Sequence, residues 1–136
     1  MNLNEISGLI VKLAIKIHHK LGPGLLESVY QRILAYELRK AGLQVETEIP
    51  IPVNWDGHTI EDSFRADLII NREVLVELKS VEQLLPVHHK QIFTYLKPTN
   101  LHLGLLINFN TPLLKDGLHR IVRDLPEDQQ PPSLNK

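Results

Sequence analysis

The sequence contains no cysteine, no long apolar run and no marked excess of either charge. Without cysteine the chain forms neither disulfides, thiolate nucleophiles nor cysteine zinc sites, so any metal must be held by Asp, Glu or His. No apolar run approaches the roughly 18 residues that span a bilayer, and the N-terminal MNLNEISG lacks the basic and apolar regions of a signal peptide. We therefore expect a cytoplasmic protein that does not enter a membrane.

The balance of charge gives no general attraction for nucleic acid. The chain has 15 Lys and Arg against 16 Asp and Glu, which gives a formal net charge of -1. Strong non-specific binding to a phosphate backbone is instead typical of an excess of positive charge. Positive charge gathers locally at residues 16–20, 39–40 and 88–90. Each of these clusters is either a binding patch or an ordinary solvated helix end.

Two helices are predicted in the N-terminal third of the chain. Apolar residues at intervals of three and four predict an amphipathic helix over residues 3–21. The Gly-Pro-Gly corner at residues 22–24 ends this helix, because proline cannot continue it and glycine accepts the dihedral angles of a tight corner. A second helix is predicted from about residue 25 to 41, with Gly42 as its C-terminal cap. Its expected core positions are Val29, Ile33, Leu34 and Leu38.

The pattern changes to strands at residue 43. QVETEIPIPV alternates apolar and polar residues, and its prolines suit an edge strand. A turn at residues 54–58 leads into a second strand ending in RADLII. The tight connection Asn71-Arg72 precedes a third strand, EVLVELKS. These segments predict an antiparallel three-stranded meander.

A helix, a buried strand and a final strand are predicted after the meander. The helix covers about residues 87–96 and ends before Pro98, because the residue preceding proline avoids the helical region. LHLGLLINF reads as a strand covered on both faces, and its Gly104 indicates close approach by another element. LLKDGLHRIV is a last strand or a hairpin arm around Asp116-Gly117.

This order of elements predicts an α/β sandwich around a mixed central sheet. The helix between EVLVELKS and LHLGLLINF should make those two strands parallel, with a right-handed connection. We expect one domain over residues 1–123. Residues 124–136 contain few apolar side chains and are expected to form a flexible tail.

Polar residues interrupt two of the apolar strands. Alternation along EVLVELKS puts Glu77 and Lys79 on one face, and antiparallel pairing brings Asp67 to the same region. Two carboxylates and an amine on a half-buried face are costly unless they pair with each other, a metal or a ligand. The plain alternative is an ion pair at the sheet edge, which would stabilise the fold little.

The spacing of these three residues suits phosphodiester hydrolysis. Hard cations such as Mg²⁺ bind few carboxylates and keep several waters, one of which can become the attacking nucleophile. The ammonium of Lys79 would orient that water and stabilise charge that develops on the phosphate oxygens.

Asp67, Glu77 and Lys79, in the arrangement D-(x9)-E-x-K, resemble the catalytic signature of the PD-(D/E)xK nuclease superfamily, although Ala66 stands where the signature has proline. GLLESVY is similar to the Gly-x-x-Glu-x-x-Tyr signature of the GxxExxY family. Further segments, FRADLII, VELKS, QIFTYLK and LGLLINF, extend the resemblance over residues 6–122. It implies a restriction-endonuclease-like sandwich with a mixed sheet, an antiparallel meander and flanking helices.

The resemblance also implies a site. In exonucleases of the RecB and phage lambda type, a Glu on the N-terminal helix joins the metal site, and Glu27 matches it. Asp67, Glu77 and Glu27 would then hold Mg²⁺ or Mn²⁺, and Lys79 would act beside them.

Three further residues are implied to contact substrate. Gln91 and Tyr95 match the Gln-x-x-x-Tyr element of these nucleases and share a helix face. Tyr30 is the third, with simple packing of its ring as the alternative.

Two functions follow as hypotheses. The first is a metal-dependent nuclease acting on DNA or RNA. The second is a weak or inactive nuclease-fold module that binds nucleic acid or a protein partner, and a homo-oligomer is open in both cases.

Overall fold

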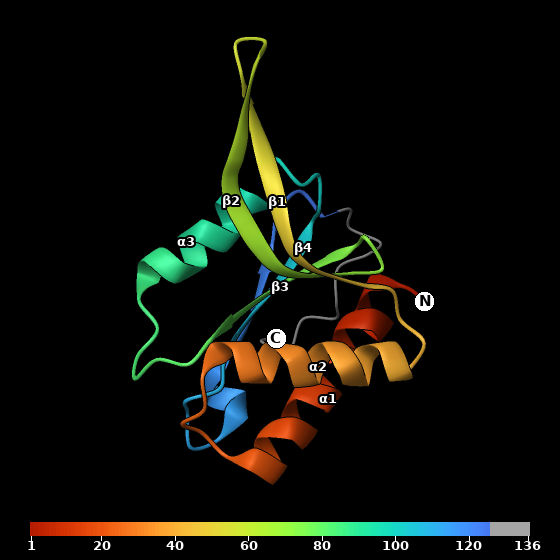
Figure 1. Ribbon diagram of the computed structural model, residues 1–136, viewed down its shortest axis with the longest axis vertical. Helices are drawn as coiled ribbons and strands as arrows, with labels where there is room; N and C mark the ends of the chain where they lie inside the picture. Colours follow the sequence, from red (N-terminus) through yellow and green to blue (C-terminus); the bar gives the residue numbers. More distant parts are fainter. Residues whose placement is uncertain (126–136) are drawn as a thin grey trace, which may run out of the picture.

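Five strands form one sheet with helices on both of its faces (Figure 1), as described for residues 1–125 by a computed structural model. The order helix, helix, three strands, helix, strand is as predicted. In chain order the elements are α1 (Leu3–Leu21), α2 (Glu27–Lys40), β1 (Val45–Trp55), β2 (His58–Ile70), β3 (Val74–Lys79), α3 (Pro86–Tyr95), β4 (Leu103–Asn108), the short 3-10 helix η1 (Leu114–Gly117) and β5 (Leu118–Val122).

Helix α1 has the predicted bounds. It begins with a capping box, in which the Asn2 side chain accepts from the Glu5 N–H at 2.8 Å and Glu5 Oε1 accepts from the Asn2 N–H at 3.0 Å. Its apolar stripe, which includes Ile6, Ile10 and Ile17, is buried against the sheet and α2. Although α1 is 19 residues long, no helix within residues 1–125 combines the length and apolar character needed to cross a bilayer.

Helix α2 begins and ends close to the predicted limits. Gly42 ends it with φ 93°, and the Leu43 N–H donates to the Leu38 carbonyl at 3.1 Å in a Schellman motif. The buried face is rotated from the predicted one. Leu34 and Leu38 are buried as expected, whereas Val29 and Ile33 are only partly covered. The remaining inner positions belong to Tyr30 and Ala35.

The sheet order is β1-β2-β3-β4-β5, with β1 at one edge. Strands β1, β2 and β3 pair antiparallel, β3 and β4 pair parallel, and β5 is antiparallel to β4. The meander, the proline-containing edge strand and the parallel pair are thus confirmed. The final segment forms a strand, but Asp116 and Gly117 belong to η1 rather than to a two-residue hairpin turn.

Two apolar cores cover the two faces of the sheet. Helices α1 and α2 bury the larger core, and α3 buries the smaller one. Along β3, Val74, Val76 and Leu78 face the larger core, while Leu75 faces α3. Glu77 and Lys79 have the parity of Leu75, so they lie on the α3 side, where an apolar layer gives way to a polar pocket.

The β1–β2 hairpin forms an arm that projects from the body of the molecule (Figure 1). Strand β3 pairs with β2 only at Leu68, Ile69 and Ile70, so beyond these residues β1 and β2 form strand pairs only with each other. The tip is a two-residue turn in which Asp56 and Gly57 have φ 50° and 79°, as a type I′ turn requires.

The end of the described chain modifies the predicted domain limit. Leu125 is buried in the larger core, so the ordered domain extends beyond residue 123. The rest of the expected tail, residues 126–136, lies outside the described residues.

Gly104→Ala should lower the free energy of unfolding by about 1–3 kcal/mol, because overpacking a filled core forces its neighbours to shift. A Cβ at this position would meet Ile92 Cγ2 at 2.5 Å, which agrees with the close approach predicted for this glycine. Urea denaturation followed by circular dichroism measures the change.

The control is Gly8→Ala, in the middle of α1, where an added Cβ meets nothing within 4 Å. This variant should gain about 0.5–1 kcal/mol from helix propensity. Equal effects of the two substitutions would contradict tight packing of α3 on β4.

Candidate functional site

A polar pocket of about 250 Å³ lies where β2, β3, α3 and the start of α2 meet. Its lining brings together six of the seven residues singled out in the sequence and adds two basic ones. The six are Glu27, Asp67, Glu77, Lys79, Gln91 and Tyr95, and the added residues are Arg65 and His88.

Asp67 and Glu77 are fixed by the backbone of the strands that carry them. Regular pairing of β2 with β3 ends at Leu68 and Val76. Beyond this point the Asp67 N–H donates to Glu77 Oε1 at 3.2 Å, and the Leu78 N–H donates to Asp67 Oδ2 at 2.8 Å. The two carboxylates therefore replace backbone carbonyls as acceptors where the strands separate.

Burial makes this carboxylate pair hold a proton. Burial, followed by the charge of Asp67, raises the pKa of Glu77 to about 9. Burial also raises the pKa of Asp67, although hydrogen bonds from Leu78 and Glu77 act in the opposite direction. At neutral pH, and with no cation beside them, the raised pKa of Glu77 keeps a proton on this pair.

Lys79 supplies the nearest positive charge from the end of β3. Strand β3 is anchored there by pairing of Lys79 with Asn108 and by the Phe109 N–H, which donates to the Lys79 carbonyl at 2.9 Å. The ammonium opposes the rise in the pKa of Glu27, Asp67 and Glu77. Within residues 1–125 it forms no ion pair shorter than 4.0 Å.

Glu27 takes part in the site through its charge. It is the first residue of α2, and its pKa is raised mainly by burial, with Lys79 lowering it. Within the described chain, however, no three His, Cys, Asp or Glu side chains are grouped closely enough to hold one metal ion. The role of Glu27 as a third metal ligand therefore stays a prediction.

The two α3 residues expected to contact substrate line the same pocket. Tyr95 stacks on Phe64 of β2, with ring centroids 3.7 Å apart and planes 7° from parallel. Burial, and then the charges of Glu77 and Asp67, raise the pKa of Tyr95. Gln91 lies one turn earlier on the same face. Their contact with a substrate stays a prediction.

Two polar residues of the pocket were not singled out as site residues from the sequence. Arg65 precedes Asp67 by two positions, so the period-two alternation that grouped Glu77 with Lys79 could have found it. His88 Nδ1 accepts from the Leu85 N–H at 3.0 Å, which is the helix-start role open to it in the sequence. Its ring also lowers the pKa of Glu27.

Tyr30 does not reach the pocket. It is fully buried, and its ring stacks on Phe109 with centroids 4.3 Å apart. Its hydroxyl donates to the Gly22 carbonyl at 2.5 Å and accepts from the Leu25 N–H at 3.1 Å. The expectation of substrate contact is thus corrected to the packing alternative, since Tyr30 closes the corner from which α2 starts.

Comparison with known proteins gives one match. The family model of the PD-(D/E)XK nuclease superfamily matches residues 4–121. No curated protein and no solved structure matches the chain. The matched range includes β1 to β4, all of β5 except its last residue, and every residue of the pocket. The resemblance seen in the sequence is therefore confirmed at the level of the superfamily.

Tyr30→Phe should lower the free energy of unfolding by about 0.5–1.5 kcal/mol, because it removes the two part-buried hydrogen bonds of the hydroxyl to Gly22 and Leu25. Thermal and urea denaturation measure the loss. Tyr36→Phe, on the exposed side of the same helix, should change stability by less than about 0.5 kcal/mol. Equal stability of the two variants would contradict the structural role of Tyr30.

Glu77→Gln should remove a loss of stability that wild type suffers as the pH rises. A carboxyl whose pKa is higher in the folded than in the unfolded chain holds its proton more tightly when folded. The raised pKa of Glu77 therefore stabilises the folded state of wild type below pH 4.5, which is the pKa of this group in the unfolded chain. This stabilisation is lost as the pH rises towards 9. The difference should be on the order of a few kcal/mol.

Urea denaturation across this pH range, without divalent cations, measures the effect. The matched control is Glu61→Gln on the exposed arm, which should follow the wild-type profile. If the free energy of unfolding depended on pH in the same way for wild type and Glu77→Gln, the conclusion that the carboxylate pair holds a proton would be contradicted.

Proposed function

The chain belongs to the PD-(D/E)XK nuclease superfamily, and on that premise we propose that it is a metal-dependent nuclease that hydrolyses phosphodiester bonds of DNA or RNA. The observation that carries this proposal is the buried Asp67–Glu77 pair, held by backbone amides and adjoined by Lys79. The narrower assignment to the GxxExxY family is part of the proposal and rests on Gly24, Glu27 and Tyr30.

The donor set fits one hard divalent cation, Mg²⁺ or Mn²⁺. Such ions accept one or two carboxylates and complete their coordination with water or phosphate oxygens, so Asp67 and Glu77 suffice as protein ligands. A cation would also replace the proton that the buried pair otherwise holds. When bound, it supplies a lowered pKa for water and neutralises charge on the phosphate.

The other pocket residues have separate roles in this proposal. Lys79 stabilises negative charge that develops on the phosphate oxygens, with little competition because no ion pair occupies it within the described chain. Glu27 adjusts the field at the pair and accepts hydrogen bonds from water. Gln91 and Tyr95 position the strand from the α3 side.

One observation favours the second candidate, a nuclease-fold module that binds nucleic acid or protein without cleaving it. Within residues 1–125 no third acidic or histidine ligand joins Asp67 and Glu77. A pair in which Glu77 keeps its proton at neutral pH attracts a cation less strongly than two ionised carboxylates would.

Two measurements on wild type, Glu77→Ala and Lys79→Ala test the proposal. The first is calorimetric titration with Mn²⁺, and the second is cleavage of labelled single-stranded and duplex DNA and RNA. Wild type should bind Mn²⁺ and cleave, and Glu77→Ala should do neither. Lys79→Ala should bind Mn²⁺ but cleave about 100-fold more slowly, the usual loss when one stabilising group is removed.

Lys97→Ala, an exposed lysine after α3, is the control and should cleave as wild type does. Wild-type cleavage by Lys79→Ala would contradict the role of that lysine. A folded wild type that binds no Mn²⁺, even with an oligonucleotide present, would favour the non-cleaving module.

A further inference from the structure

A groove between α2 and β1 adjoins the site and has no part in the chemistry proposed above. Its volume is about 400 Å³, within the range of small-ligand sites. Its lining combines two arginines and one glutamate with small and polar side chains. These residues are Ser28, Gln31, Arg32, Ala35, Arg39, Thr47 and Glu48.

The groove lies beside the polar pocket. Gln31 lies between them, since its Nε2 donates to Glu48 Oε1 at 2.8 Å in the groove and to the Asp67 carbonyl at 3.4 Å beside the carboxylates. Glu27 of the pocket and Ser28 of the groove are neighbours at the start of α2. A polymer that crosses the carboxylate pair can therefore continue along α2.

The arginines of the groove are not neutralised by the fold. Arg39 Nη2 donates to the Val45 carbonyl at 2.9 Å, and no ion pair or hydrogen bond engages the Arg32 side chain within residues 1–125. Both residues are exposed. They lie seven residues apart, about 10 Å along the helix axis, so they would contact different phosphates of one strand.

A surface for a base lies beside Arg32. Tyr36 is 63% exposed, and a shallow apolar hollow joins it to Val29 and Ile33 with Arg32 at its edge. The described chain places no other ring against Tyr36. Exposed aromatic rings next to cationic side chains are the usual platform for stacking an unpaired base.

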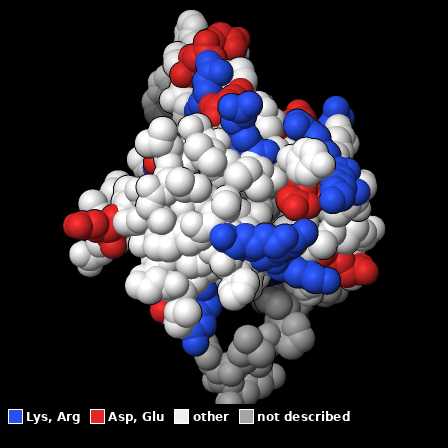
Figure 2. All heavy atoms as spheres, turned by 60° about the horizontal axis from the view of Figure 1, so that its bottom comes forward, with Lys and Arg blue, Asp and Glu red and all other residues white. Residues whose placement is uncertain are grey.

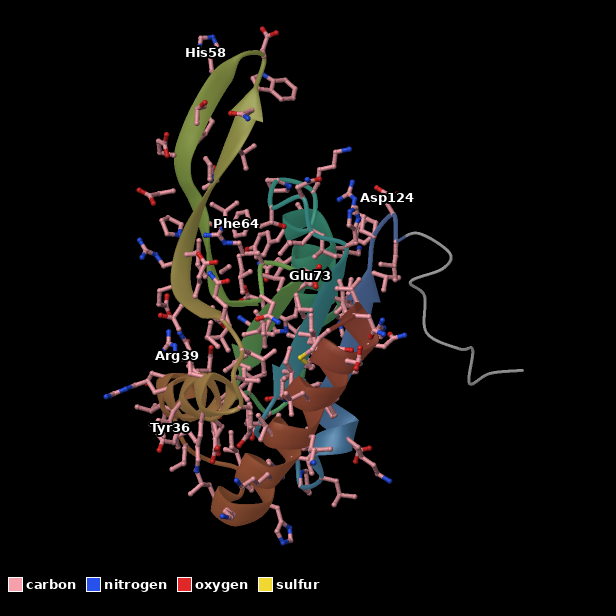
Figure 3. All side chains as sticks on the ribbon, turned by 90° about the vertical axis from the view of Figure 1, so that its right-hand side faces the viewer. Tyr36, Arg39, His58, Phe64, Glu73 and Asp124 are labelled. Atoms are coloured by element: carbon pink, nitrogen blue, oxygen red, sulfur yellow. The ribbon has the colours of Figure 1, made fainter. Side chains whose placement is uncertain are left out.

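The wider surface agrees with an anionic partner. Figure 2 looks towards the end of the molecule that carries α1 and α2, and Lys and Arg side chains gather near the middle of this view. From the side, Tyr36 and Arg39 both project outward from α2, away from α1 (Figure 3). A chain with net charge -1 therefore presents local positive charge at the end that carries α1 and α2.

We propose that the groove between α2 and β1 binds the backbone of a single nucleic-acid strand, with Arg32 and Arg39 on successive phosphates and a base stacked on Tyr36. This inference rests on the proposed function, because it places the strand that is cleaved at Asp67 and Glu77. A single strand is favoured over a duplex because Tyr36 needs an unpaired base. An acidic protein segment is disfavoured because only a phosphodiester chain would use both the groove and the pocket.

Fluorescence anisotropy with a labelled oligothymidylate of about 12 nucleotides, in the presence of EDTA, tests binding without cleavage. The double variant Arg32→Ala/Arg39→Ala should bind at least about 10-fold more weakly. The slope of log K against log salt concentration should become shallower by about 1.4, as expected for two lost phosphate contacts on a single strand. Tyr36→Ala should weaken binding about 10-fold, and Tyr36→Phe should not.

The control Lys12→Ala/Lys97→Ala removes the same charge from exposed positions outside the groove and should keep the wild-type slope. Arg32→Glu provides a second test that breaks no hydrogen bond between described residues, whereas Arg39 also ties α2 to β1. Circular dichroism confirms that each variant is folded.

The proposed role of the groove would be overturned if the arginine variants kept the wild-type affinity and the wild-type salt dependence. It would also be overturned if wild type bound duplex DNA or polyglutamate more tightly than the oligonucleotide. These results are separate from those on cleavage. Loss of binding in the arginine variants with no cleavage by wild type would support the groove and contradict the nuclease. Cleavage by wild type with an unchanged KM in the arginine variants would do the reverse.

Discussion

The exchange of hydrogen bonds between Asp67, Glu77 and the backbone of β2 and β3 is the constraint on which the site depends. Each carboxylate accepts from an amide of the neighbouring strand, where the regular ladder has just ended. The register that pairs Leu68 with Val76 therefore also sets the positions of the acidic groups. A slip of β2 by one residue against β3 would turn Asp67 into the larger core, away from Glu77, where its burial would be far more costly. Stability of the meander and geometry of the pocket thus rest on the same bonds.

The segment that begins α2 combines a structural residue with a site residue. Tyr30 bonds to both sides of the glycine-proline corner and packs on Phe109, so it fixes where the helix starts. Glu27, one turn earlier, is thereby held at the edge of the pocket. The three-residue spacing places Glu27 and Tyr30 in the first turn of α2, where one belongs to the pocket and the other fixes the start of the helix. Gly22 and Gly24 allow the corner itself, because they adopt positive φ angles of 72° and 106°.

Periodicity explains which parts of this structure could be predicted from the sequence. Intervals of three and four residues found α1 and α2, and alternation found the meander and put Asp67, Glu77 and Lys79 together. These are local patterns, and they persist whatever the rest of the chain does. The role of Tyr30 could not be found in this way, because its partner Phe109 comes from β4's far end, much later in the chain. The orientation of α2 was also missed, because packing against the sheet turned Val29 and Ile33 partly outward. The groove follows from that rotation, since it depends on how α2 sits against β1.

The arm formed by β1 and β2 has a consequence for spectroscopy. Trp55 is the single tryptophan of the chain, and it lies beside the turn at the arm's tip with 75% of its surface exposed. Its indole is thus already surrounded by water in the folded protein. Intrinsic fluorescence excited at tryptophan will consequently report on the surroundings of the arm and hardly at all on melting of the two cores. A shift of this emission towards shorter wavelength would indicate that another molecule has covered the tip.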